Sequence, residues 1–154
     1  NSLRWQQDTH SITRDYLVLV HGVVDKATTL DDALISIPGG SAVAVEGRPA
    51  RTSVHPLARL QTQSDDAADF TLLAVRILTG RKHQIRVHLS HAGHPVVCDA
   101  RYGRAHLNAD LQWCERNFLH RYLLAFQDLN DSRCEVVEPL PQDLTTALTS
   151  LSPV

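Results

Sequence analysis

The sequence predicts an α/β fold of the α+β type, with a mixed, mainly antiparallel sheet and few helices. Residues 16–24, 51–62 and 70–78 are rich in apolar and β-branched residues and are long enough for strands. Short turns join these strands and few segments have a helical pattern, which favours antiparallel pairing. A chain of 154 residues suits one domain with a real core, so we expect residues 1–154 to form a single domain.

The first part of the chain is expected to hold one long buried strand followed by weaker elements. Residues 16–24 are almost continuously apolar, which is typical of a strand buried on both faces. Residues 31–37 carry mixed signals and are interpreted as a short connection, whereas residues 42–46 predict a brief strand. Residues 47–49, with the sequence GRP, indicate a turn.

The second and third long strands are expected to be joined by the polar hairpin loop 64–69. In the strand 51–62, Pro56 lacks an N–H group, so it should restrict the strand to an edge or force a bulge. Residues 70–78 alternate well enough for a half-buried strand. The side chains that face the core are either Leu73, Val75 and Ile77 or, in the opposite register, the residues between them.

A helix is predicted over residues 81–92. Ile85 and Leu89 lie four positions apart on one helical face, and Gly93 is a natural stop just after the last turn. The remaining elements are expected in this order: a loop at 103–110, a helix or turn at 111–117, a hairpin of 121–127 with 135–137 around residues 130–131, and a helix at 142–151 opened by Pro141.

The charge of the chain is unevenly distributed. Its net charge is −2, which does not indicate a nucleic-acid binder. Residues 76–104, however, hold one anion, Asp99, and six cations: Arg76, Arg81, Lys82, Arg86, Arg101 and Arg104. A basic face on an otherwise acidic body suits a site that grips phosphates at one place. The plainer interpretation is a solvated helix face that is basic by chance.

Other features of the composition bear on the environment of the protein. The chain has three widely spaced cysteines and no CxxC pair, which favours an intracellular, reducing compartment over a disulfide framework. No apolar run approaches the roughly 20 residues that a membrane-spanning helix needs, so we expect no membrane partner.

Residues 78–89, with the sequence LTGRKHQIRVHL, carry the clearest chemistry in the chain. An apolar strand enters a Thr-Gly turn that launches a helix bearing Arg81, Lys82 and Arg86. Helix starts bind anions because free N–H groups and the helix dipole point at the ligand. Arginine adds forked donors that fit a phosphate or a carboxylate. A strand–turn–helix connection with a solvated basic face is the alternative.

The order of these residues resembles the signature of RluA-type pseudouridine synthases. That signature reads T-G-R-x-H-Q-I-R-x-H-L, followed by G-x-P-I-x-G-D-x-x-Y-G, and residues 79–103 match nearly every fixed position. Cys98 stands where the family usually has glycine, and we expect this change to be structural. Weaker similarities to family segments occur at residues 13–22, 50–52, 118–121 and 139–144, so the resemblance covers most of the chain.

The resemblance implies a pseudouridine-synthase-like fold and the isomerisation of a uridine in structured RNA, ribosomal or transfer, without a cofactor. It implies that Tyr16 packs against the flipped uracil and is a candidate for proton transfer. Arg81 would pair with the catalytic aspartate and occupy the space that the extruded base leaves. Ile85 is a candidate for the pocket floor. The candidate RNA-binding cations are Lys82, Arg86, Arg101 and Arg104.

The family's catalytic aspartate lies in an H-R-L-D segment upstream of the strand that carries Tyr16, and no such segment occurs here. Asp8 has neither the flanking residues nor the spacing. The chain begins at Asn1 and contains no Met, so we expect it to be the C-terminal portion of a catalytic domain within a longer polypeptide. The missing segment would then supply the aspartate.

Two other classes of function remain open from the sequence. The chain could be a catalytically inactive, synthase-like subunit that binds RNA or serves as a scaffold in a ribonucleoprotein. A metal-binding or hydrolytic enzyme is less favoured. His88 and His91 lie one helical turn apart, but no third ligand has suitable spacing and there is no HExxH pattern. The resemblance implies no metal and a structural hydrogen-bonding role for His83 and His88.

Overall fold

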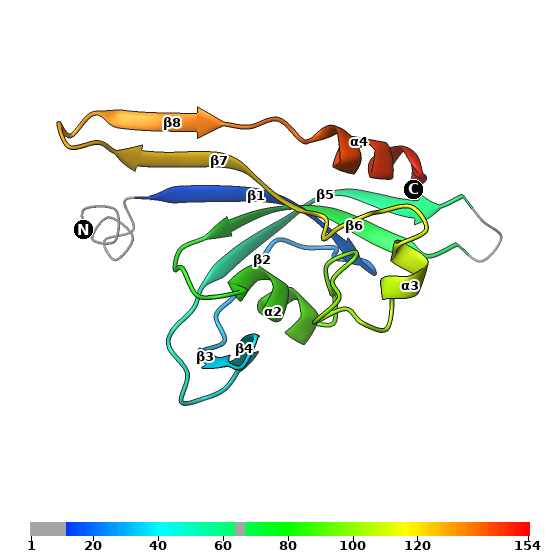
Figure 1. The fold of residues 1–154 in the computed structure, drawn as a ribbon, viewed down its shortest axis with the longest axis horizontal. Coiled ribbons are helices and arrows are strands. Elements are labelled where there is room, and N and C mark those ends of the chain that lie inside the picture. The colour runs from blue at the N-terminus through cyan, green and yellow to red at the C-terminus, as the bar shows by residue number, and fades with distance from the viewer. Residues whose placement is uncertain (1–11, 64–66) are drawn as a thin grey trace.

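The computed structural model of the protein describes residues 12–63 and 67–154 (Figure 1). The strands are β1 (Thr13–His21), β2 (Thr28–Leu30), β3 (Leu34–Ile37), β4 (Gly40–Val43), β5 (Thr52–Thr62), β6 (Asp69–Ile77), β7 (Leu119–Gln127), β8 (Arg133–Val137) and β9 (Leu151–Pro153). The helices are α2 (Gln84–His91), α3 (Leu107–Asp110) and α4 (Gln142–Thr149). None of the described helices is long and apolar enough to cross a membrane.

The main sheet has seven strands in the order β2-β5-β6-β1-β7-β8, with β9 paired to β5, and β3 and β4 form a separate hairpin. Every strand pairing in the described residues is antiparallel. The predicted fold class, an α+β fold with a mainly antiparallel sheet, is therefore confirmed. The sheet forms one continuous layer, with α2 against one face and α4 against the other (Figure 1).

Strand β1 lies in the middle of the sheet, between β6 and β7. Val18, Leu19 and Val20 are fully buried, which confirms the expectation of a strand covered on both faces. Because side chains alternate along a strand, Leu19 packs with α4 in one cluster, and Val18 and Val20 pack with α2 in the other. The two cores of the protein thus meet at this strand.

In the hairpin of β5 and β6, the structure decides between the alternatives that the sequence left open. The pairing shifts register between Pro56 and Ala58, so the proline sits at a bulge, one of the two placements expected. Leu73, Val75 and Ile77 are the buried set of β6 on the α2 face. Of the polar loop predicted at 64–69, residues 64–66 lie outside the described residues.

Short elements differ from the predictions. Strands β2 and β9 were not expected, since three residues carry too little pattern and gain their strand conformation from pairing with β5. Residues 34–37 form β3, where a connection was expected. The short helix α3 falls at the end of the predicted loop 103–110, whereas the turn at 111–113 agrees with the helix or turn predicted for 111–117. Helix α4 ends at Thr149 because Leu151 already pairs with Thr62.

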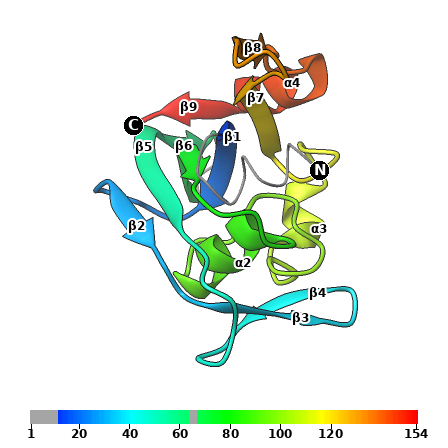
Figure 2. The same cartoon turned by 90° about the vertical axis from the view of Figure 1, so that its left-hand side faces the viewer.

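Helix α2 lies between the main sheet and the β3–β4 hairpin, as Figures 1 and 2 both show. It ends as predicted. Gly93 has a φ of 87°, and its N–H donates to the Ser90 carbonyl at 3.1 Å. The N–H of His94 donates to the Leu89 carbonyl at 2.9 Å. This glycine cap reverses the chain and fixes the path of the segment that carries residues 98–104.

Candidate functional site

The turn between β6 and α2 is held by one buried side chain. Gln84, only 2% exposed, accepts hydrogen bonds from the Arg81 backbone N–H at 3.0 Å and the Thr79 hydroxyl at 2.9 Å. Its amide nitrogen donates to the Arg51 carbonyl and to the Thr52 hydroxyl, both at 3.0 Å. Helix α2 therefore begins at Gln84, three residues later than predicted, and residues 79–83 form a fixed turn.

Arg81 lies in this turn and is partly exposed. Its Nε donates to the carbonyl of Pro49 at 3.1 Å, which ties the arginine to the segment that leads into β5. We expected Arg81 at the first residue of the helix, and the structure corrects this detail, because the N-cap is His83 with a φ of 55°. The guanidinium is held at one nitrogen and stays accessible for a further partner.

Tyr16 lies on β1, opposite Val75 of β6 and Arg121 of β7. It packs on the cluster that includes Val18 and Ile85, so its ring is on the face of the sheet that α2 covers. A hollow of about 380 Å³ opens beside the ring. Its lining consists of Tyr16, His120, Arg121, Leu124, Val136 and Glu138.

Tyr16 and Arg81 are 65 positions apart in sequence, yet the sheet brings them to the same end of the molecule. Tyr16 pairs with Val75, two residues before β6 ends at Ile77, and Arg81 follows in the next turn. Both belong to the α2 side of the sheet. Arg81 does not line the hollow at Tyr16, so a single cleft containing both side chains stays a prediction.

Ile85, the candidate pocket floor, is 6% exposed and packs with Val18 and Leu89 in the core. Its position therefore shows a packing role, and contact with a substrate stays a prediction.

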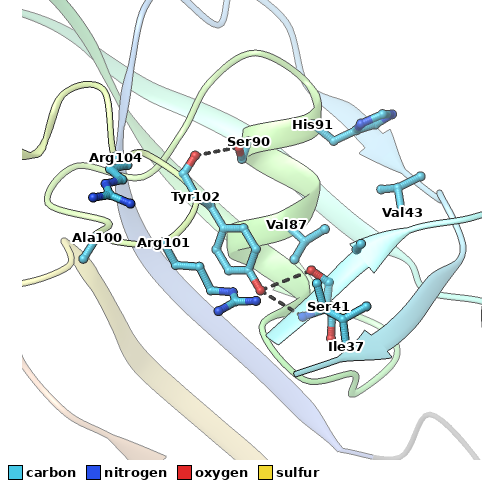
Figure 3. Close-up of a pocket in the computed structure, with 11 residues that line it drawn as sticks. Ile37, Ser41, Val43, Val87, Ser90, His91, Ala100, Arg101, Tyr102 and Arg104 are labelled. Carbon is cyan, nitrogen blue, oxygen red and sulfur yellow. Dashed lines mark hydrogen bonds between the residues drawn. The ribbon is translucent and has the colours of Figure 1, made fainter. Parts of the chain in front are cut away.

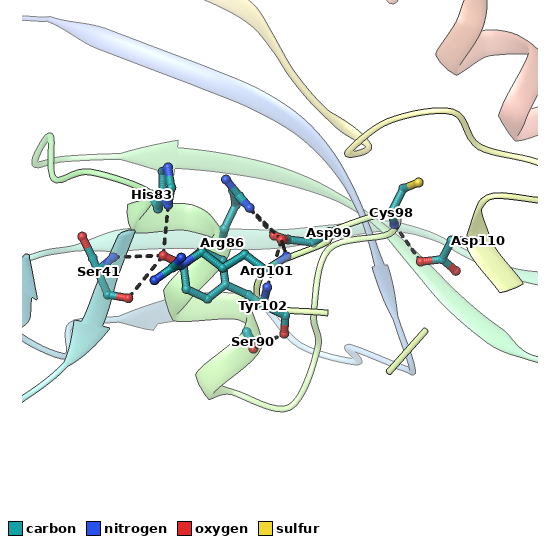
Figure 4. Close-up of polar contacts among 9 residues, drawn as sticks. All are labelled: Ser41, His83, Arg86, Ser90, Cys98, Asp99, Arg101, Tyr102 and Asp110. Carbon is teal, nitrogen blue, oxygen red and sulfur yellow. Dashed lines mark hydrogen bonds and ion pairs between the residues drawn. The ribbon is translucent and has the colours of Figure 1, made fainter. Parts of the chain in front are cut away.

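Arg86 forms an ion pair with Asp99. Its Nε and Nη2 donate to the two carboxylate oxygens of Asp99, each at 2.7 Å, and Asp99 is fully buried (Figure 4). The backbone N–H groups of Arg101 and Tyr102 also donate to this carboxylate, at 2.9 and 3.0 Å. The guanidinium of Arg86 neutralises a buried carboxylate and so supports the fold, and RNA binding by Arg86 stays a prediction.

The pKa of Asp99 reflects two opposing effects. Burial on its own would raise the pKa of this carboxyl group, but the hydrogen bonds from Arg86 and from two backbone N–H groups outweigh burial and lower the pKa. Asp99 is therefore ionised at neutral pH, and the same contacts raise the pKa of Arg86. The pair stays charged on both sides over the physiological range.

The basic segment 76–104 is accordingly less available than its sequence indicated. Besides Arg86, Arg76 is also paired, with both carboxylate oxygens of Asp15 at 2.6 Å. Lys82 and Arg104 are exposed. Arg101 is exposed too, although its Nη2 donates to the Pro38 carbonyl at 2.8 Å. RNA binding by Lys82, Arg101 and Arg104 stays a prediction.

Arg101 and Arg104 border the largest of the hollows described, about 610 Å³ between α2, the β3–β4 hairpin and the loop of residues 100–104 (Figure 3). The rest of the lining is mixed: Ile37, Val43 and Val87 are apolar, and Ser41, Ser90 and His91 are polar. Cationic side chains beside apolar and polar groups are compatible with a nucleotide, whose phosphate is anionic and whose base is apolar on its faces.

Sequence reasoning missed the role of Tyr102. Its hydroxyl accepts from the Ser41 backbone N–H at 2.9 Å, donates to the Ser41 carbonyl at 3.2 Å and lies 3.0 Å from His83 Nδ1. The guanidinium carbons of Arg86 and Arg101 lie 5.0 and 5.6 Å from its ring centroid. Tyr102 thus fastens the hairpin to the turn before α2 (Figure 4). The available signal was its fixed place in the D-x-x-Y-G pattern.

The histidines are engaged in hydrogen bonds. His88 is fully buried, with Nδ1 2.9 Å from the Thr52 hydroxyl and Nε2 2.9 Å from the Asp32 carbonyl. Since both ring nitrogens have protein partners, His88 cannot join His91 as a metal ligand. Residues 12–63 and 67–154 contain no group of three or more His, Cys, Asp or Glu side chains placed to hold a metal ion.

Cys98 has a φ of 60°, the left-handed conformation that glycine adopts most easily, which explains why the family pattern has glycine here. The buried carboxylate of Asp110 accepts a hydrogen bond from the Cys98 N–H at 2.7 Å. The Cys98 thiol donates to the Cys114 carbonyl at 2.9 Å, and burial raises its pKa to about 11. The cysteine is therefore structural, as expected, and chemically unreactive.

Comparison with known proteins agrees with the fold. A family model described as RNA pseudouridylate synthase matches residues 1–91. An uncharacterized RNA pseudouridine synthase of Chloroflexus aurantiacus is 38% identical over 156 residues, which cover 97% of this chain and 46% of that protein. Ribosomal large subunit pseudouridine synthase C of Yersinia pestis is 34% identical over 159 residues, with 97% and 48% covered.

Among solved structures, human RNA Pseudouridylate Synthase Domain Containing 1 matches with a TM-score of 0.80 and 25% identity, over 99% of this chain and 64% of that one. The sheet, its helices and the position of the turn thus define a pseudouridine-synthase-type domain. The chain belongs to the RNA pseudouridylate synthase family, which confirms the resemblance to RluA-type enzymes. It spans about half the length of the curated relatives that it matches.

Proposed function

We propose that this chain forms the tyrosine- and arginine-bearing part of an RNA pseudouridine synthase that isomerises uridine in structured RNA. The observation that carries the proposal is the placement of Tyr16 and of the Arg81 turn at one end of the sheet, on its α2 side. The catalytic aspartate is supplied by a segment outside residues 1–154. Asp8, which lacks the flanking residues and spacing of the catalytic aspartate, lies outside the described residues.

The chemistry requires a flipped base, a nucleophile and a route for protons. Extrusion of a uridine from a structured RNA costs a few kcal/mol, which stacking and hydrogen bonds in a pocket offset. Tyr16 offers a ring for stacking and a hydroxyl for proton transfer. Arg81 offers a cation that keeps a carboxylate ionised in a partly desolvated pocket. The glycosidic bond is cleaved, and the same uracil is rotated and rejoined through carbon.

The RNA is proposed to be ribosomal, because relatives such as the Yersinia pestis protein carry the name ribosomal large subunit pseudouridine synthase. Contacts to its phosphates would come from the exposed cations of the basic segment, Lys82, Arg101 and Arg104. An intracellular, reducing location fits the free cysteines Cys98, Cys114 and Cys134.

A catalytically inactive RNA-binding or scaffold subunit is the second candidate. The absence of an H-R-L-D segment from residues 1–154 favours it. The two candidates share the RNA-binding surface and differ only in whether uridine reacts.

Tritium release from 5-labelled uridine distinguishes them. The full-length protein, including any segment upstream of Asn1, should release tritium from ribosomal RNA, whereas the 154-residue chain alone should not exceed a blank reaction. The reason is that the isolated chain lacks the nucleophile. Release by the chain alone would refute the assignment of the aspartate to another segment, and no release by the full-length protein would favour the scaffold.

RNA affinity should depend on salt through the exposed cations. We expect Arg104→Ala to weaken binding of structured RNA regardless of sequence, and to lower the slope of log affinity against log salt by roughly one unit, since one phosphate contact is lost. Filter binding at two salt concentrations measures this. Arg133→Ala, which removes an exposed arginine on β8, is the matched control and should leave the slope unchanged. Equal slopes for both variants would contradict a role for Arg104.

A further inference from the structure

Arg14 is a buried cation that forms no ion pair with any residue in ranges 12–63 and 67–154. The residue is only 7% exposed, and its Nε is buried without a hydrogen bond. Burial lowers its pKa, the nearby Tyr16 raises it and Arg121 lowers it. Buried arginines are almost always paired, because an isolated charge loses several kcal/mol of hydration.

The surroundings of Arg14 belong to the hollow at Tyr16. Arg14 and Tyr16 are two positions apart on β1, so both side chains lie on the α2 face. Across the strand pair, Arg14 faces Leu124 and Tyr16 faces Arg121, and Leu124 and Arg121 both line the hollow. Figure 1 shows β1 and β7 side by side along this region. Arg14 therefore neighbours the proposed base-binding tyrosine on the same face of β1.

The nearest carboxylate in sequence cannot neutralise Arg14. Asp15 points to the opposite face of the sheet, where both of its oxygens are bound by Arg76 at 2.6 Å. Glu138 lines the hollow, but none of the ion pairs among the described residues joins it to Arg14. On the α2 face, Arg14 and Arg121 thus leave an excess of positive charge beside the Tyr16 phenol.

We propose that Arg14 is a positioning residue that holds a protein carboxylate beside Tyr16, namely that of the catalytic aspartate. The proposal rests on the proposed function, which requires this carboxylate. Its occupant is a side chain rather than an RNA phosphate, because Arg14 is nine-tenths buried and is not among the residues that line the hollow. A planar carboxylate matches the forked donors of a guanidinium in a site that water does not reach.

This assignment gives the carboxylate two cations, Arg14 from β1 and Arg81 from the turn before α2. Two positive neighbours in a desolvated site favour the ionised form of a carboxyl group, which is the reactive one. Arg14 also fixes the position of the carboxylate relative to Tyr16, because both residues come from one strand.

The test uses the full-length protein and the variants Arg14→Met and Arg14→Lys, with Arg133→Met as an exposed control. In the absence of RNA, Arg14→Met should lower the melting temperature, since it removes one of the two cations that neutralise a buried carboxylate. The kcat of tritium release should fall by about 100-fold as the carboxylate shifts, with KM and RNA affinity within two-fold of their original values. Arg14→Lys should restore part of kcat, because a cation remains. The control should match the unaltered protein.

A melting temperature of Arg14→Met equal to or above that of the unaltered protein would overturn the proposal, because it would show that Arg14 has no anionic partner. Loss of RNA affinity with unchanged kcat would overturn it in favour of a phosphate. If the unaltered protein releases tritium and Arg14→Met does so equally well, this proposal fails and the proposed function stands. If the unaltered protein releases none but Arg14→Met is destabilised without RNA, the proposed function fails and the carboxylate pairing is supported.

Discussion

Replacing Tyr16 with phenylalanine is expected to lower kcat for uridine isomerisation by the full-length protein by about 10²- to 10⁴-fold, the range that one proton-transfer group contributes. The ring is kept, so its packing against the cluster of Val18 and Ile85 should persist and the melting temperature should change little. Stacking of the flipped base should also persist, so KM should stay close to its original value. Tritium release at several RNA concentrations measures both constants.

Tyr122→Phe is the matched control for this change. Tyr122 lies on the neighbouring strand β7 but lines a separate hollow with Asp15 and Arg76, on the opposite face of the sheet. Loss of its hydroxyl should leave kcat unchanged. An active Tyr16→Phe enzyme would show that the hydroxyl transfers no proton in the limiting step and would reduce Tyr16 to a stacking surface.

Arg86→Ala should destabilise the fold by about 3–5 kcal/mol, the usual cost of breaking a buried ion pair. The variant leaves the fully buried carboxylate of Asp99 with only two backbone donors, Arg101 N–H and Tyr102 N–H. Urea unfolding of the full-length protein measures the free energy of unfolding. A loss of RNA affinity at unchanged stability would instead support the prediction that Arg86 binds phosphate.

The loss should depend on pH in a defined direction. The pKa of Asp99 is lowered in the folded protein, so its pairing stabilises the fold above the unfolded carboxyl pKa and is lost as pH falls through the folded value. The difference in unfolding free energy between Arg86→Ala and the unaltered protein should therefore shrink in acid. The double variant Arg86→Ala with Asp99→Ala should be less destabilised than the sum of the single changes, because the two residues interact directly. Arg104→Ala is an exposed control for stability.

The long strands could be read from the sequence because each has a strong local pattern. The apolar run of β1 predicts burial, which is confirmed. The alternation in β6 left two registers open and the proline of β5 left an edge or a bulge open, and the tertiary structure decided both. The two ends of α2 differ in whether the local sequence predicts them. Gly93 marks the C-terminal end by its own backbone preference, whereas the first turn is displaced by Gln84, whose bonds reach Arg51 and Thr52 more than thirty residues away. A contact between residues so far apart in the chain cannot be predicted from the local sequence pattern.

The sequence by itself determined the family of this protein, its sheet-based architecture and the residues on which its chemistry is proposed to rest, because a turn such as T-G-R and the side chains that follow it are local features. Only the tertiary structure decided which cations are available. Arg76 and Arg86 belong in sequence to one basic segment with Arg104, yet both of them pair with carboxylates, whereas Arg104 forms no ion pair with a described residue. Likewise, the candidacy of Arg14 depends on its burial and on an Nε that has no hydrogen-bond partner in the described part of the chain. The sequence shows which side chains are charged, but the hydration and pairing of each charge depend on residues that folding brings together from distant positions.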